Sequence, residues 1–396
     1  MNLKKYIKNN FAELLILAIF VFQIPIWPLW YIPYMPLSFL FCILFFLKKG
    51  SLKTDQTRRK MLAVILLGLA FVIMPYLNGG GHGSNFLYFL CFIGAISITY
   101  KEANTTVEML SKGLGIIVVI TLIPWIYHQA ISPLPSLGSI DLTAMKGNYT
   151  VMENYGFFVI NPTANVFRFY SVFDEPGALG TLGAYLLYAN KYQFSKWYNL
   201  SILLGCLCTL SAAFYILTLM GMLYLSIGSM RRLLMIVIPL LIIFWIGYEF
   251  IKDSEEFNGF VVERILNASD SLDERSGDAV GAFFKRMSLF ELLFGIGYSR
   301  VVELGLDYGA SYKNFIIENG LVSLLILIYS YWNLHKKTNR DVLVFTAMFW
   351  LSFLQRPTSF TGWQMLIYAC IVTRLAYCQE INKSKMIPSP FKQEMT

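Results

Sequence analysis

Residues 113–130, GLGIIVVITLIPWIYHQA, contain no Asp, Glu, Lys or Arg. A stretch of this kind is typical of a membrane-spanning helix, because a helix needs roughly 20 apolar residues to cross a hydrocarbon layer about 30 Å thick. Comparable stretches occupy residues 11–30, 62–77, 233–251 and 314–332. Across the chain 56% of the residues are hydrophobic and only 14% are charged, so the sequence predicts an all-α polytopic membrane protein.

The apolar pattern predicts about twelve transmembrane helices. They are expected near residues 11–31, 33–47, 61–78, 86–100, 113–130, 176–193, 197–211, 213–229, 233–251, 314–333, 341–355 and 363–378. The stretch 197–230 is too long for one span and short for two, and we expect a turn at Ser211-Ala212-Ala213. A single tilted helix there would instead move every later segment to the other side of the membrane.

The predicted organisation has four parts. Residues 1–251 hold the first nine helices and a periplasmic loop at 131–175, and residues 252–313 form a large periplasmic loop. Residues 314–378 hold the last three helices, and 379–396 form a cytoplasmic tail. In the large loop, residues 259–267 and 280–294 place apolar side chains at helical spacing among charged ones, which indicates short amphipathic helices at the membrane surface.

Charge predicts the orientation. Most of the 32 Lys and Arg residues fall in connections on the side of the N-terminus, whereas most of the 24 acidic residues fall on the other side. By the positive-inside rule, both termini are cytoplasmic in a bacterial inner membrane. The net charge of +8 therefore implies no nucleic-acid partner. The basic start followed by an apolar run is similar to a signal peptide, but no small-residue cleavage site follows, so we expect a retained first helix.

Six arginines are predicted on the exterior face, against the charge rule. They are Arg168, Arg264, Arg275, Arg286, Arg300 and Arg356. A guanidinium stays charged and binds phosphate through two parallel hydrogen bonds, which suits a lipid-linked diphosphate. Alternatively, these arginines pair with nearby acidic side chains, and Arg356 extends to the lipid headgroups. The cysteines and histidines form no metal-type cluster, so no metal site or cofactor is expected.

Acidic and polar residues at two predicted helix starts are candidates for the chemistry. Glu175 precedes Pro176 and could act as a general base, with Asp174 as the structural N-cap, or Glu175 could itself be a capping or ion-paired residue. Asn314 and Glu318 lie four residues apart, on one helix face, beside Tyr312. They could orient sugar hydroxyls or simply cap the helix.

Four short motifs follow one another along the chain. They are Arg168 followed by Phe173-Asp-Glu175-Pro-Gly-Ala-Leu-Gly180, then Leu210-Ser211-Ala212-Ala213, then Arg286 with Leu293-Phe-Gly295-Ile-Gly297, and then Ser311-Tyr-Lys-Asn314 through Glu318-Asn-Gly320. In this order the motifs resemble those of the Wzy-type polysaccharide polymerases, relatives of the O-antigen ligases. The resemblance covers nearly the whole chain in architecture.

The resemblance implies a GT-C-like fold that transfers a growing glycan from undecaprenyl diphosphate to a new lipid-linked repeat unit, without metal. It implies catalytic roles for Glu175, Arg168 and Arg286 in a periplasmic site. The implied substrate-binding residues are Arg264, Arg275, Arg300, Tyr312, Asn314, Glu318 and Arg356. The implied partners are undecaprenyl-diphosphate-linked glycans, membrane lipid and a Wzz-type chain-length regulator.

Two other functions remain open. An O-antigen ligase would use the same chemistry, but ligase relatives often carry a histidine near the position of Ser311, which this sequence lacks. A polysaccharide flippase or other transporter belongs to a different class. Transporters usually place ionisable residues near the middle of the bilayer, whereas the central parts of these predicted helices are almost free of charge.

Overall fold

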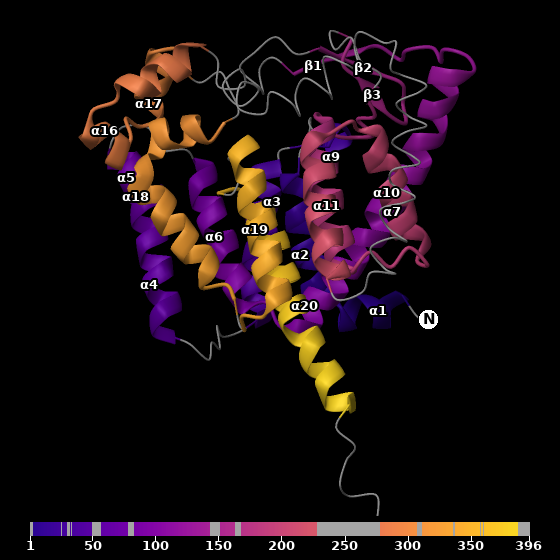
Figure 1. The fold of residues 1–396 in the computed structure, drawn as a ribbon, viewed down its shortest axis with the longest axis horizontal. Coiled ribbons are helices and arrows are strands. Elements are labelled where there is room, and N and C mark those ends of the chain that lie inside the picture. Colours follow the sequence, from indigo (N-terminus) through magenta and orange to yellow (C-terminus); the bar gives the residue numbers. More distant parts are fainter. Residues whose placement is uncertain are drawn as a thin grey trace, which may run out of the picture.

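A computed structural model describes residues 3–386 apart from 25, 30–31, 33, 50–56, 78–82, 143–150, 163–167, 228–277, 307–310, 336, 357 and 359. This part of the chain is mostly helical, with one small sheet. In Figure 1 the long helices run between two ends of the molecule. The end that carries strands β1–β3 is named the sheet end, and the opposite end, where α1 lies, is named the α1 end.

The elements before residue 131 are α1 (Leu3–Asn9), α2 (Phe11–Gln23), the 3-10 turn η1 (Trp27–Leu29), α3 (Tyr34–Lys49), α4 (Thr57–Gly68), the π-helical turn η2 (Leu69–Ile73), α5 (Met74–Leu77), α6 (Gly83–Ser97) and α7 (Tyr100–Ala130). The next group is β1 (Ser139–Asp141), β2 (Val151–Asn154), β3 (Val159–Ile160), α9 (Pro176–Ala189), α10 (Trp197–Cys208) and α11 (Ala212–Ser226). The last group is a helix over 278–286, α16 (Leu289–Phe294), α17 (Tyr298–Glu303), α18 (Tyr312–Trp332), α19 (Arg340–Gln355) and α20 (Gly362–Met386).

The helical character predicted from the sequence is confirmed. Helices α7 and α18 are each long and apolar enough to cross a membrane, and α2, α6, α10 and α11 are shorter apolar helices. A turn separates α10 from α11 as expected, although it lies at 209–211 and not at 211–213, so the single-helix alternative for 197–230 is wrong. The predicted helix 233–251 and the predicted amphipathic segment 259–267 lie outside the described residues.

Helix α7 begins earlier than predicted. The sequence indicated a connection over 101–112, but the helix starts at Tyr100 behind a capping box. The backbone N–H of Thr99 donates to Glu102 Oε2 at 2.8 Å, and the backbone N–H of Glu102 donates to Thr99 Oγ1 at 3.4 Å. These two bonds satisfy donors that a helix start leaves free, so the polar residues of 101–112 extend the helix.

The small sheet was not predicted. It lies within the loop 131–175 and has the antiparallel order β1-β2-β3, with Ser139 paired to Glu153 and Glu153 paired to Ile160. Its inner side chains pack on Tyr170, in a cluster with Ile140, Met152 and Val159. The sheet therefore rests on the segment that leads into α9.

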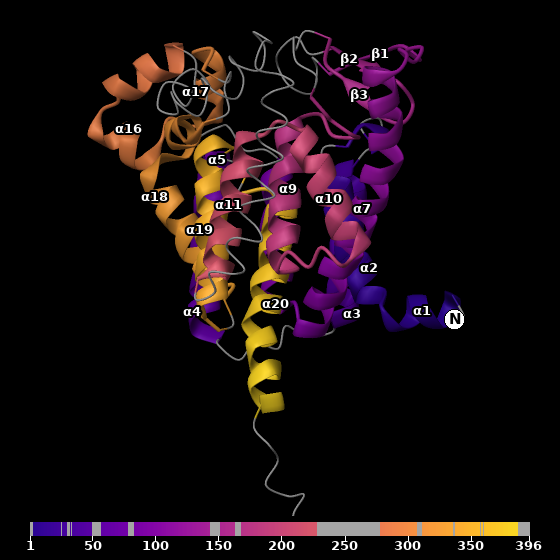
Figure 2. The same cartoon turned by 45° about the vertical axis from the view of Figure 1, so that its right-hand side comes forward.

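Helix α18 is broken at Gly320, whose φ of 78° and ψ of 166° are non-helical. The break frees carbonyls that a continuous helix would use. The backbone N–H of Ile296 donates to the Ile317 carbonyl at 2.8 Å, and that of Gly297 donates to the Glu318 carbonyl at 3.0 Å. Loop 295–297 therefore fastens α16 and α17 to α18, and Figures 1 and 2 show these helices together at the sheet end, on the side away from the sheet.

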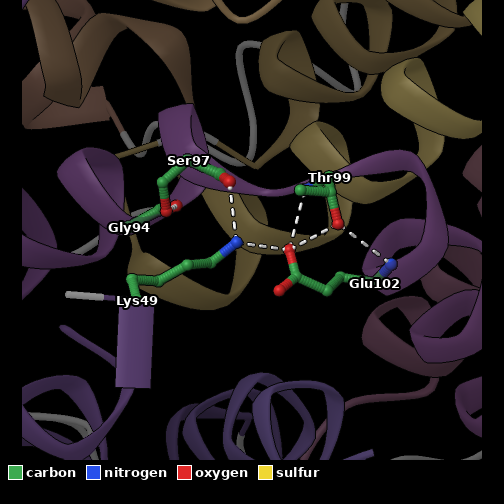
Figure 3. A network of polar contacts seen from close by, with 5 residues as sticks. All are labelled: Lys49, Gly94, Ser97, Thr99 and Glu102. Atoms are coloured by element: carbon green, nitrogen blue, oxygen red, sulfur yellow. Dashed lines mark hydrogen bonds and ion pairs between the residues drawn. The ribbon is translucent and has the colours of Figure 1, made fainter. Parts of the chain in front are cut away.

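A buried polar network joins α3, α6 and α7 at the α1 end (Figure 3). Lys49 Nζ donates to Glu102 Oε2 at 2.6 Å and to the Ser97 carbonyl at 3.0 Å. The two charged side chains are only 14% and 12% exposed. Because this carboxylate also caps α7, the ion pair connects the end of one helix to the start of another.

The Lys49→Met variant is expected to be less stable by about 1–3 kcal/mol, because Glu102 then keeps its buried charge without the ammonium group. The thermal unfolding midpoint of the purified protein in detergent measures this loss. Lys48→Met removes an exposed lysine from the same helix end and is the matched control. Equal midpoints for the two variants would contradict a structural role for the pair.

Candidate functional site

Glu175 stands at the start of α9. It has an extended backbone, with φ of −142° and ψ of 133°, and Pro176 follows as the first helical residue, where its missing N–H costs nothing. Glu175, and not Asp174, occupies the N-cap position, and its side chain makes no capping bond. The carboxylate instead forms an ion pair with Arg356. The structure therefore contains the ion pair that was the alternative role for Glu175. The Glu175 side chain nevertheless stays 44% exposed.

Arg356 follows the last turn of α19 and lies across the first turn of α9. Its guanidinium packs against Gly177 so closely that a Cβ at that position would come within 2.5 Å of Nη2. Only glycine leaves this space, because every other residue carries a Cβ. The side chain is 24% exposed, so the guanidinium is partly withdrawn from water. This contact holds the positive charge beside Glu175.

Arg168 is held by the turn between α10 and α11. Its Nε donates to the Thr209 carbonyl at 3.0 Å, and the neighbouring Phe169 N–H donates to the Cys208 carbonyl at 2.9 Å. The turn exposes these carbonyls because α10 ends at Cys208 and Leu210 adopts a positive φ of 48°. The Leu210-Ser211 motif therefore has a local function, which is to position Arg168.

Tyr170 links Arg168 to Glu175. Burial raises the pKa of the Tyr170 phenol, and the Glu175 carboxylate raises this pKa further, whereas the Arg168 guanidinium lowers it. Both charges therefore act on the same phenol. Arg168, Glu175 and Arg356, with Tyr170 beside them, form a group at the sheet end of the bundle, which is named the arginine–glutamate group.

Two other predicted arginines lie on different elements. Arg286 ends the helix 278–286 and is exposed, and its Nε donates to the Ala282 carbonyl of that helix at 3.1 Å. Arg300 on α17 pairs with Glu303 at 2.6 Å, with both side chains exposed. Within the described chain, no hydrogen bond or ion pair joins Arg286 to the arginine–glutamate group. Arg264 and Arg275 lie outside the described residues.

The predicted residues of α18 form its first turns. Asn314 accepts a hydrogen bond from Ser311 Oγ at 3.1 Å and donates to the Leu306 carbonyl at 3.2 Å. These bonds favour a structural role at the helix start over the orientation of sugar hydroxyls. The Tyr312 ring contacts Phe284 edge to face. Phe315 packs edge to face on Phe353, one turn before Arg356, so this half of α18 approaches the same end of α19.

Sequence reasoning gave no role of their own to three contributors, which are Gly177, the Thr209 carbonyl and Tyr170. A glycine after Pro176 and a backbone carbonyl carry no distinctive signal, since their roles depend on partners that are distant in the chain. Tyr170, two residues from Arg168, could have been found by its proximity.

The fold and this group together define a mostly helical protein, with two helices able to cross a membrane and a partly exposed cluster of charges at one end. No family model, no curated protein and no solved structure matches the chain.

Proposed function

We propose that the chain is a Wzy-type polymerase of a bacterial inner membrane. It would join undecaprenyl-diphosphate-linked repeat units into O-antigen or capsular polysaccharide at the periplasmic face. The observation that carries the proposal is the arginine–glutamate group, in which a reachable carboxylate pairs with Arg356 and acts, together with Arg168, on the same Tyr170 phenol. A base next to cations suits a reaction that removes a proton and releases a diphosphate.

The proposed topology has about twelve spans, with both termini cytoplasmic and the sheet end periplasmic. Large apolar side chains on the outer faces of several helices support a lipid surrounding. Ile123 of α7 and Leu325 of α18 are each 65% exposed, and they lie on the two helices that are long enough to cross a bilayer. Lipid accommodates such side chains without the cost that water would impose.

In the proposed reaction, a hydroxyl of the acceptor sugar attacks the anomeric carbon of the donor glycan. Glu175 takes the hydroxyl proton while the new carbon–oxygen bond forms. The bond between the anomeric carbon and the diphosphate oxygen breaks, and undecaprenyl diphosphate leaves with the electron pair. Arg168 and Arg356 stabilise the charge that develops on the leaving diphosphate.

The experiment supplies purified protein in lipid vesicles with lipid-linked repeat units and measures released undecaprenyl diphosphate. Arg356→Gln is expected to reduce the rate about 100-fold, because one preorganised charge donor is lost. Arg340→Gln, at the other end of α19, is the matched control and should retain the wild-type rate. Arg356→Gln with the wild-type rate would reject the proposed site, and no release by the wild-type protein would reject the function.

A further inference from the structure

Arg374 on α20, at the other end of the bundle, has a partly buried guanidinium group with unsatisfied donors. Its Nε and Nη1 atoms are buried and have no hydrogen-bond partner in the described part of the chain. A guanidinium carries five N–H donors and keeps its charge, so burying it with two nitrogens unsatisfied is unfavourable. An anion that accepts these hydrogen bonds would remove the penalty.

Other cations surround the same place. Lys112 on α7 forms an ion pair with Glu108 one turn earlier, at 2.7 Å. Arg374 and Lys196 both act electrostatically on the Glu108 carboxylate, and Lys196 Nζ lies 6.0 Å from the Tyr198 ring on α10. Lys112, Lys196 and Arg374 therefore converge from three elements on one carboxylate, which leaves positive charge in excess. These three residues and Glu108 are named the cation cluster.

The cation cluster lies toward the α1 end. Tyr377, one turn after Arg374, contacts Tyr100 at the start of α7, with ring centroids 5.4 Å apart. Tyr6 of α1 acts electrostatically on Lys112. Figures 1 and 2 show α1 extending sideways from this end, across the direction of the long helices. A short helix in this orientation, with exposed lysines, is typical of one lying at a membrane surface.

An apolar track continues from the cation cluster along the same helix faces. Ile116 and Ile120 follow Lys112 at intervals of four residues on α7, and both are exposed. On the adjacent α10, Trp197, Leu200 and Leu204 are exposed at helical spacing. A tryptophan at a helix end beside cations is typical of the headgroup level of a bilayer. The surface thus presents the positively charged cation cluster, followed by the apolar track.

We propose that the cation cluster binds the phosphate of an anionic phospholipid, with the acyl chains lying along the apolar track between α7 and α10. Arg374 and Lys112 bind the phosphate oxygens, and Lys196 closes the site from α10. Phosphate is the matching chemistry because a guanidinium and two ammonium groups can share its oxygens. A lipid is favoured over a soluble phosphate because the apolar track begins at the cation cluster. This site is independent of the proposed polymerase site.

The test measures phosphatidylglycerol retained by the full-length protein after purification in detergent, by native mass spectrometry. We expect the wild-type protein to retain phosphatidylglycerol in preference to phosphatidylcholine. Arg374→Gln and the double variant Lys112→Gln/Lys196→Gln are each expected to retain at least fivefold less. Lys101→Gln removes an exposed lysine from the first turn of α7 and should retain the wild-type amount. Equal retention by all variants would overturn the proposal.

A second measurement covers the case in which Arg374→Gln does not fold. Added phosphatidylglycerol should raise the thermal unfolding midpoint of the wild-type protein and of Lys101→Gln, but not that of Lys112→Gln/Lys196→Gln. The lysine pair is the safer test because Lys112 is 51% exposed and contributes little to packing. An equal rise with inorganic phosphate alone would overturn the assignment to a lipid.

Discussion

Glu175→Gln is expected to lower the rate of undecaprenyl diphosphate release by about 100-fold to 10,000-fold, the range typical of a general base. Glutamine keeps the size of the side chain and its position at the N-cap of α9. It cannot accept the proton of the attacking hydroxyl. The assay uses purified protein with lipid-linked repeat units, and thermal unfolding of the same samples reports whether the fold is retained.

Two controls separate catalysis from structure. Glu303→Gln removes a carboxylate from an arginine pair on α17 and should leave the rate unchanged. The swap Glu175→Arg with Arg356→Glu preserves the ion pair but moves the carboxylate to α19. We expect the swap to retain much of the stability and to remain inactive. An active swap, or a Glu175→Gln rate within a few-fold of wild type, would show that the carboxylate is only structural.

Gly320→Ala is expected to detach α16 and α17 from α18. The φ of 78° and ψ of 166° lie in a region that is almost confined to glycine, and other residues lose about 1–3 kcal/mol there. The added Cβ would also come within 2.6 Å of the Gly295 nitrogen and 2.5 Å of the Phe294 carbonyl carbon. Because these are backbone atoms, loop 295–297 must move, and the hydrogen bonds to the Ile317 and Glu318 carbonyls break.

The measurement is limited proteolysis with trypsin. Lys285 and Arg286 are exposed at the end of the helix 278–286 and give cleavage sites directly before the detached α16. We expect cleavage there to be at least tenfold faster in Gly320→Ala than in the wild-type protein. Gly281→Ala is the matched control, because a Cβ at residue 281 meets nothing within 4 Å, and alanine there should be neutral or stabilising by up to about 1 kcal/mol. Equal cleavage in all three proteins would show that the break at Gly320 is not needed to fasten α16 and α17 to α18.

Gly295, on the other side of this backbone contact, also leaves no room for a side chain. Its φ is 73°, and an added Cβ would approach the Glu318 carbonyl carbon to 2.7 Å. The motif Leu293-Phe-Gly295-Ile-Gly297 was noted in the sequence, with Arg286, for its resemblance to the Wzy-type polymerases. The structure gives its two glycines a packing function, which is to let two backbones meet at the break in α18.

The arginine–glutamate group shows which parts of a site can be read from sequence. Glu175, Arg168 and Arg356 were each identified as candidates, because a carboxylate before a proline and guanidinium groups in exterior loops are unusual in themselves. Their arrangement was not identified. The resemblance placed Arg168 and Arg286 with Glu175 in the catalytic group, whereas the structure pairs Glu175 with Arg356, and Arg286 lies exposed on another element.

Composition and spacing by themselves determined the mostly helical character, the presence of a turn between α10 and α11 and the choice of charged candidates. Those features depend on local properties: apolar length, capping residues and the position of proline and glycine. The tertiary structure alone decided the pairing of Glu175 with Arg356, the carbonyl that holds Arg168 and the break in α18. Each of these depends on a partner distant in the chain, often a backbone group that every residue possesses, so only the packing of the helices selects it.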